Sequence, residues 1–366
     1  MSWKVPEVMA TVGPTLEKPD DLRRAIQEGA RWFRFPCGYR QRPHTENACA
    51  VRAAAAQVGV PVQLLLDLPS SRPRTGAMQE LRLAVGDRIV LWDSEVLSYP
   101  PGSQNGCVAV PLPGLEEFQA KLAPNHGMWF CDGRLRFVVE EVNLSSVVAR
   151  MVEGTAPLKS SNSLFLPDSA SPFAPITPPD RALLRAFADA DLRPEWVALS
   201  LIASAEDVRL ARREARKTLG RDFRVMAKFE TMAAVECAED IIRESDGLMV
   251  ARGDLALAVG YIRVPEVQEH LVAAARRAGK VSVVATQVLE GFAETGLPQR
   301  AELSDLSLIA RQRAGAVMLG KETVYSPRPI ECIRLAVEVL THETQRFEAE
   351  SRAPGAGGQG RARARS

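Results

Sequence analysis

Short apolar segments alternate with segments of helical spacing along most of this chain, and this alternation limits its fold more than any other feature. Before residue 77, strands are expected in EVMATV, RWFRFP and PVQLLLDLP, with helices in LEKPDDLRRAIQEGA and over 43–58. After residue 195 the expected order is strand 196–202, helix 205–219, strand 223–229, helix 232–243, strand 247–251, helix 265–278, strand 281–285, helix 299–313, strand 316–319 and helix 327–345. Eight apolar strands alternating with helices predict an α/β fold, a (β/α)8 TIM barrel. A doubly wound open sheet is the alternative, but its usual Gly-rich first turn is lacking.

A different pattern interrupts this alternation after the third strand. Short alternating segments separated by Gly, Pro and Asn, such as DRIVLW and GCVAVPL, predict a small β-rich domain inserted over residues 77–172. The barrel would then consist of residues 1–76 and 173–345. The Pro- and Ser-rich stretch 167–180 is typical of a hinge or linker. Residues 346–366 end in a Gly, Ala and Arg low-complexity segment, and we expect them to be disordered.

Composition and charge argue against nucleic-acid-binding and membrane-bound classes of protein. The 366 residues are 46% hydrophobic and 25% charged, which is typical of a soluble globular protein. A net charge of +1 argues against nucleic acid as a partner. The six cysteines are scattered without a CxxC pair, and neither a signal peptide nor an apolar run of membrane-spanning length is present. We therefore expect a cytoplasmic protein that does not bind membranes.

Three charged residues end two neighbouring predicted strands. Lys228 and Glu230 end FRVMAKFE, and Asp254 follows SDGLMVARG. Two carboxylates beside a lysine could hold Mg²⁺ or Mn²⁺, or could form a structural ion-pair network. The barrel favours the functional interpretation, because active sites on this fold lie at the C-terminal ends of the strands. The polar residues expected to meet there are Arg34, Asp67, Arg74, Ser200, Lys228, Glu230, Asp254, Thr286 and Glu322.

Over roughly residues 5–345 the chain resembles the pyruvate kinase family. The stretches that carry the resemblance are ATVGP, WFRF with Arg34, LLLDL followed by RPRTG, AKFE, SDGLMVARGDLA, ATQVLEGF, RAELSD and MLGKET. The resemblance implies that the insert is a lid over the barrel mouth, with CDGRLRF similar to the family's DDG turn. It also implies small-molecule substrates, phosphoenolpyruvate with ADP or pyruvate with ATP, and leaves open a homodimer through the barrel.

The resemblance assigns roles to individual residues. Lys228 resembles the lysine that neutralises the transferred phosphoryl group and the enolate oxygen, and Glu230 with Asp254 resemble the ligands of Mg²⁺ or Mn²⁺. The backbone N–H groups of Gly253 and Asp254, with the Thr286 hydroxyl, are similar to the family's cradle for the substrate carboxylate. The arginines that hold the phosphates correspond to Arg34 and Arg74. Accessory positions are Asp67, Lys321 and Glu322.

The chain departs from the family pattern on the phosphate side. The loop Pro36–Tyr39 lacks the family's side-chain oxygens for potassium, Leu68 replaces a threonine ligand, and Arg72 stands where a glutamate is usual. This combination is similar to potassium-independent members, in which a fixed cation replaces K⁺. We therefore expect no K⁺ requirement, with Arg72 as the replacing cation.

Other family positions on the phosphate side also differ. A serine of the family's MLSGET becomes Gly320 with Lys321 beside it, and its Phe, Arg and Lys after Ser200 become the segment 201–204. The chain also stops after the eighth helix, so we expect the family's C-terminal allosteric domain to be absent.

Three functions remain open at this point. The first is phosphoryl transfer from phosphoenolpyruvate to ADP through a metal-bound enolate, without K⁺. The second keeps the metal and enolate chemistry but makes the protein a lyase, decarboxylase or transferase acting on a 2-oxo acid or another enol phosphate. The third is a non-catalytic regulatory protein of pyruvate kinase shape.

Overall fold

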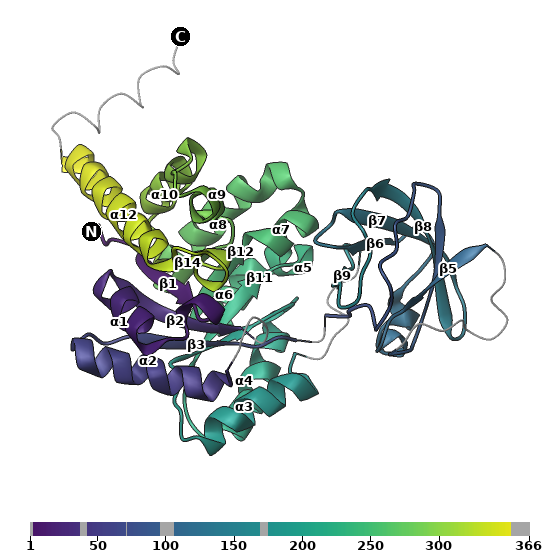
Figure 1. Ribbon diagram of the computed structural model, residues 1–366, viewed down its shortest axis with the longest axis horizontal. Coiled ribbons are helices and arrows are strands. Elements are labelled where there is room, and N and C mark those ends of the chain that lie inside the picture. The colour runs from purple at the N-terminus through teal and green to yellow at the C-terminus, as the bar shows by residue number, and fades with distance from the viewer. Residues whose placement is uncertain (1–2, 37–41, 71, 96–105, 169–174, 353–366) are drawn as a thin grey trace, which may run out of the picture.

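The computed structural model describes residues 3–36, 42–70, 72–95, 106–168 and 175–352 and contains two bodies (Figure 1). Eight parallel strands form a closed barrel in the order β1-β14-β13-β12-β11-β10-β3-β2. A second sheet of six strands has the order β5-β4-β8-β7-β6-β9 and lies to one side of the barrel. The predicted (β/α)8 barrel with a β-rich insert after the third strand is therefore confirmed.

The barrel strands are the eight apolar segments expected from the sequence, and they are buried on both faces. Their bounds are β1 (Glu7–Thr11), β2 (Ala30–Pro36), β3 (Gln63–Asp67), β10 (Trp196–Leu199), β11 (Arg224–Phe229), β12 (Gly247–Ala251), β13 (Val281–Ala285) and β14 (Ala316–Leu319). The interior is filled by methionine, tryptophan and aliphatic side chains, so the barrel is a packed core. Trp32 and Trp196 contact each other with ring centroids 5.2 Å apart, and the Arg224 guanidinium lies 4.3 Å from the Trp196 ring.

Helices surround the barrel, and their inward faces pack on the outer faces of the strands. The longer ones are α1 (Pro19–Gln27), α2 (His44–Val58), α3 (Pro178–Asp189), α4 (Ala205–Leu219), α8 (Val264–Arg277), α10 (Arg300–Gln312) and α12 (Pro329–Arg352). The shorter ones are α5 (Met232–Glu236), α6 (Ala238–Glu244), α7 (Arg252–Val259), α9 (Glu290–Thr295) and α11 (Lys321–Val324). Within the described residues, no helix is long and apolar enough to cross a membrane.

Three of the expected helical regions differ in the structure. The single helix expected over 232–243 is divided into α5 and α6, with Cys237 between them. Helix α3 begins inside the stretch assigned to a hinge, because Thr177 and the fully buried Asp180 form a capping box and proline occupies the first turn. Helix α12 continues to Arg352, beyond residue 345, where it was expected to end. Phe347 packs on Trp3 with ring centroids 5.8 Å apart, and ion pairs such as Arg346–Glu350 support the added turns. Residues 353–366 lie outside the described part of the chain.

The inserted sheet, which we call the lid, has its own core. Its strands are β4 (Arg88–Trp92), β5 (Cys107–Pro111), β6 (Gly127–Phe130), β7 (Leu135–Val142), β8 (Ser146–Gly154) and β9 (Leu164–Phe165). One face carries a fully buried aliphatic and aromatic cluster that includes the Phe130–Phe137 pair. Edge strand β9 lies on the side of the lid that faces the barrel (Figure 1). The domain boundaries at residues 76/77 and 172/173 stay a prediction.

Candidate active site

The ammonium group of Lys228 lies at the centre of the charged cluster. Lys228 is near the end of β11, and its side chain is buried. Its Nζ donates to Ser200 Oγ at 2.7 Å and lies 3.0 Å from Glu230 Oε1 and 3.2 Å from Asp67 Oδ1. Burial on its own would lower the pKa of Lys228, but the negative charges of Asp67 and Glu230 outweigh burial and raise it. The lysine therefore stays charged.

Asp67, at the end of β3, joins Lys228 to a second cation. Arg34 Nε donates to Asp67 Oδ2 at 2.7 Å, and Arg34 Nη1 donates to Thr11 Oγ1 at 3.3 Å. Burial would raise the pKa of Asp67, but Lys228 and Arg34 outweigh that effect and hold the pKa below its usual value. Asp67 is therefore an ionised bridge that fixes two cations at the mouth of the barrel.

Two further carboxylates lie next to this bridge. Glu230 is 2% exposed and accepts a hydrogen bond from the Leu201 N–H at 2.8 Å. Burial and the nearby charge of Asp254 raise the pKa of Glu230, although Lys228 opposes them. Asp254 lies in the first turn of α7 and pairs with Arg72 at 2.7 Å. Burial would raise the pKa of Asp254, but Arg72 lowers it.

The turn after β13 brings Thr286 to the start of α7. Thr286 and Gln287 both have left-handed backbones, with φ of 74° and 52°. The Gly253 N–H donates to Thr286 Oγ1 at 3.0 Å. Arg252 holds this turn, since its guanidinium donates to the Thr286 carbonyl at 2.6 Å and to the Asp305 carboxylate at 2.7 Å. Neither Arg252 nor Asp305 was predicted as a site residue, although both lie in the quoted stretches SDGLMVARGDLA and RAELSD.

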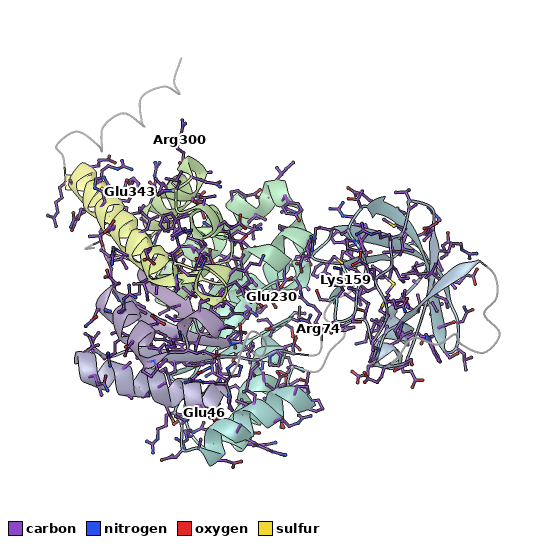
Figure 2. All side chains as sticks on the ribbon, viewed as in Figure 1. Glu46, Arg74, Lys159, Glu230, Arg300 and Glu343 are labelled. Atoms are coloured by element: carbon purple, nitrogen blue, oxygen red, sulfur yellow. The ribbon has the colours of Figure 1, made fainter. Side chains whose placement is uncertain are left out.

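Three predicted residues lie away from this cluster. Arg74 is exposed and donates to the Ser161 carbonyl at 3.0 Å, in the connection between barrel and lid (Figure 2). Lys321 is 66% exposed, with Nζ 3.7 Å from Glu290 Oε1. Glu322 is fully buried, and its carboxylate accepts from backbone N–H groups, including Val288 at 3.0 Å and Gly320 at 2.7 Å. The geometry makes Glu322 an organiser of the loops. Of the reshaped loop 36–39, only Pro36 is within the described residues.

The carboxylate oxygens of the site suit a hard divalent cation that needs few protein ligands. Among the described residues, no three His, Cys, Asp or Glu side chains gather as a metal site. Glu230 and Asp254 are nevertheless close enough for each to affect the pKa of the other. Two carboxylates fit Mg²⁺ or Mn²⁺, which keep other coordination positions for water and substrate oxygens. The residues present therefore fit such an ion.

The contacts of Arg252 with Asp305 and the Thr286 carbonyl, which we call the Arg252 clamp, can be tested by substitution. We expect Arg252→Gln to lower the free energy of unfolding by about 2–4 kcal/mol, because it removes the donor to Asp305 and to the backbone carbonyls of residues 285–287. Urea unfolding followed by circular dichroism measures the change. The matched control is Arg213→Gln on an exposed face of α4, where an exposed ion pair with Glu206 is lost and the cost should stay under about 1 kcal/mol. Equal losses in the two variants would contradict the clamp.

Comparison with known proteins shows which family this chain is similar to. The family model "Pyruvate kinase, barrel domain" matches residues 3–333. Pyruvate kinase of Methylorubrum extorquens is 33% identical over 331 residues, which are 89% of this chain and 66% of that protein. Pyruvate kinase of Agrobacterium vitis is 32% identical over 337 residues, 91% of this chain and 67% of that protein. The chain thus spans about two thirds of the length of these relatives. The chain belongs to the pyruvate kinase family.

Proposed function

We propose that this protein transfers a phosphoryl group from phosphoenolpyruvate to ADP with the help of Mg²⁺ or Mn²⁺. One observation carries the proposal: the buried ammonium of Lys228 is held between Asp67, Glu230 and Ser200, and its charge also acts on a third carboxylate, Asp254. Phosphoryl transfer depends on positioning and on neutralising charge that develops in the transition state. A charged lysine fixed beside a pair of metal-binding carboxylates supplies both.

The other residues of the site have roles in binding. The N–H groups of Gly253 and Asp254 at the start of α7, with the Thr286 hydroxyl, would hold the substrate carboxylate. Arg34 would bind the phosphoryl group, since Asp67 orients its guanidinium through Nε at the mouth of the barrel. Phosphate binding remains the proposed role of Arg74, whose guanidinium lies in the connection between barrel and lid. A divalent cation bound by Glu230 and Asp254 would neutralise substrate oxygens.

Arg72 supports the further proposal that K⁺ is not required. Its guanidinium lies 2.7 Å from Asp254 Oδ1, and its side chain is only 16% exposed. Burial would lower the pKa of Arg72, but Asp254 outweighs burial and raises it, so the group is permanently charged. A fixed positive charge beside a metal-binding carboxylate can replace a monovalent cation.

A metal-dependent lyase, decarboxylase or transferase is the second candidate. It is favoured by the segment 201–204 after β10, which stands where the family has Phe, Arg and Lys and carries no Arg or Lys; Leu201 and Ile202 there are buried aliphatic side chains. The acceptor side of the site thus offers fewer cations for a nucleotide. A non-catalytic role is less well supported, because such a protein would have no physical need to bury Lys228. A homodimer through the barrel is proposed on the family relationship alone, and a cytoplasmic location on the scattered cysteines as well.

Replacement of the central lysine tests the reaction. We expect Lys228→Met to lower kcat at least about 100-fold, since it removes a preorganised charge from the transition state. A coupled assay with phosphoenolpyruvate, ADP and Mg²⁺ measures turnover. The control is Lys280→Met, just before β13, where Nζ donates to the Ser245 carbonyl at 2.7 Å, and it should retain kcat. Turnover that survives Lys228→Met would refute the assigned role.

Monovalent cations provide an independent test. We expect turnover of the unaltered protein in tetramethylammonium buffer to change less than about twofold when KCl is added, because Arg72 supplies the charge. Arg72→Glu should lower turnover without K⁺ and make it rise with KCl. The measurement is the same coupled assay with its reagents free of K⁺. A strict K⁺ requirement in the unaltered protein would contradict the replacement of K⁺ by Arg72.

A further inference from the structure

Side chains from four strands and one connecting segment form a continuous row from the lid to the active site. We call Glu153, Arg136, Trp129, Phe165 and Arg72 the lid row. Glu153 pairs with Arg136 at 2.9 Å, and the Arg136 guanidinium lies 4.9 Å from the Trp129 ring. Trp129 stacks on Phe165 with centroids 5.8 Å apart, and the Arg72 guanidinium lies 6.0 Å from the Phe165 ring. Beyond Arg72 is Asp254, at 2.7 Å.

Strand register explains why these side chains line up. Directly opposed residues on neighbouring antiparallel strands point to the same face. Glu153 is opposite Arg136, Arg136 is opposite Trp129, and Trp129 is opposite Phe165. The row is therefore built into the pairing of β8, β7, β6 and β9.

The segment before the lid continues this sheet past its edge strand. Arg74 forms an antiparallel bridge with Ser163, and the Leu164 N–H donates to the Pro73 carbonyl at 2.8 Å. Extending that register places Arg72 opposite Phe165. The backbone thus holds Arg72 as the last member of the row, and its guanidinium lies between an aromatic ring of the lid and a carboxylate of the barrel.

We propose that Phe165 and Trp129 are positioning residues, which hold the Arg72 guanidinium against Asp254 and so make the lid sheet part of the active site. An arginine side chain has several rotatable bonds, and an aromatic face restricts it while leaving its hydrogen bonds free. Phe165 is only 7% exposed, so its contact with Arg72 is largely shielded from water. The catalytic part of this inference rests on the proposed function, in which Arg72 supplies a fixed charge.

The test compares the parent protein with Phe165→Leu, Arg72→Met and the double variant. Leucine keeps an apolar side chain at residue 165 but removes the ring. We expect Phe165→Leu to lower kcat/KM about 2- to 30-fold, the range for loss of a partly desolvated cation–π contact. The same substitution should have no further effect when Arg72 is already methionine. Phe165→Tyr, which keeps the ring, should retain kcat/KM.

A control separates positioning from general damage to the lid. Phe137 lies next to Arg136 on β7 but faces the opposite side, in the lid core. Phe137→Leu should destabilise the lid and leave kcat/KM of the folded protein unchanged. A loss of kcat/KM equal to that of Phe165→Leu would overturn the positioning role.

Urea unfolding of the same four proteins gives a measurement that needs no activity. We expect the double variant to lose less stability than the sum of the two single variants. If the two substitutions have non-additive effects on the free energy of unfolding but the parent protein shows no turnover, the contact is upheld and the proposed reaction is refuted. Turnover with additive effects of Phe165→Leu and Arg72→Met on kcat/KM would uphold the reaction and overturn this inference. Additive effects in both measurements would also overturn it.

Discussion

The structure of the site depends on the burial of one ammonium group. Lys228 can remain charged inside the barrel mouth only because Asp67 and Glu230 lie within 3.2 Å and 3.0 Å of its Nζ. Asp67 in turn orients Arg34, and Glu230 is held by the Leu201 N–H. Strands β3, β10 and β11 are neighbours in the barrel, so the closure of the sheet brings these groups together. These ion pairs and hydrogen bonds position the charged groups before any substrate arrives, and electrostatic catalysis uses such preorganised charges.

Much of the fold could be predicted because apolar periodicity reports burial directly. Parallel strands buried on both faces produce uninterrupted apolar runs, and all eight are strands in the structure. Helix α3 was missed because proline and serine suggested a linker, although Thr177 and Asp180 have capping-box spacing. Helix α12 was predicted to end too early. Its last turns are supported by Phe347, which packs against Trp3, and local sequence does not indicate a contact between segments so far apart in the chain.

The candidate site was predictable only in part. Strand ends indicated that Lys228, Glu230 and Asp254 would meet, and the structure brings them to one cluster. The pairing of Arg252 with Asp305, and of Arg72 with Asp254, depends on loop geometry between distant segments. Arg74 was predicted to meet the other site residues, but its guanidinium lies along the connection between barrel and lid and outside the charged cluster. In the lid row, strand register and side-chain identity together connect a surface glutamate of the lid to the barrel mouth.

We propose that Lys228, with a divalent cation held by Glu230 and Asp254, would stabilise the enolate form of pyruvate. Exchange of the methyl protons of pyruvate with solvent deuterium, followed by NMR, tests this step without requiring a nucleotide. We expect exchange that needs Mg²⁺ or Mn²⁺ and is abolished in Lys228→Met. Absence of exchange in the unaltered protein with the metal present, or exchange that continues without Lys228, would contradict it.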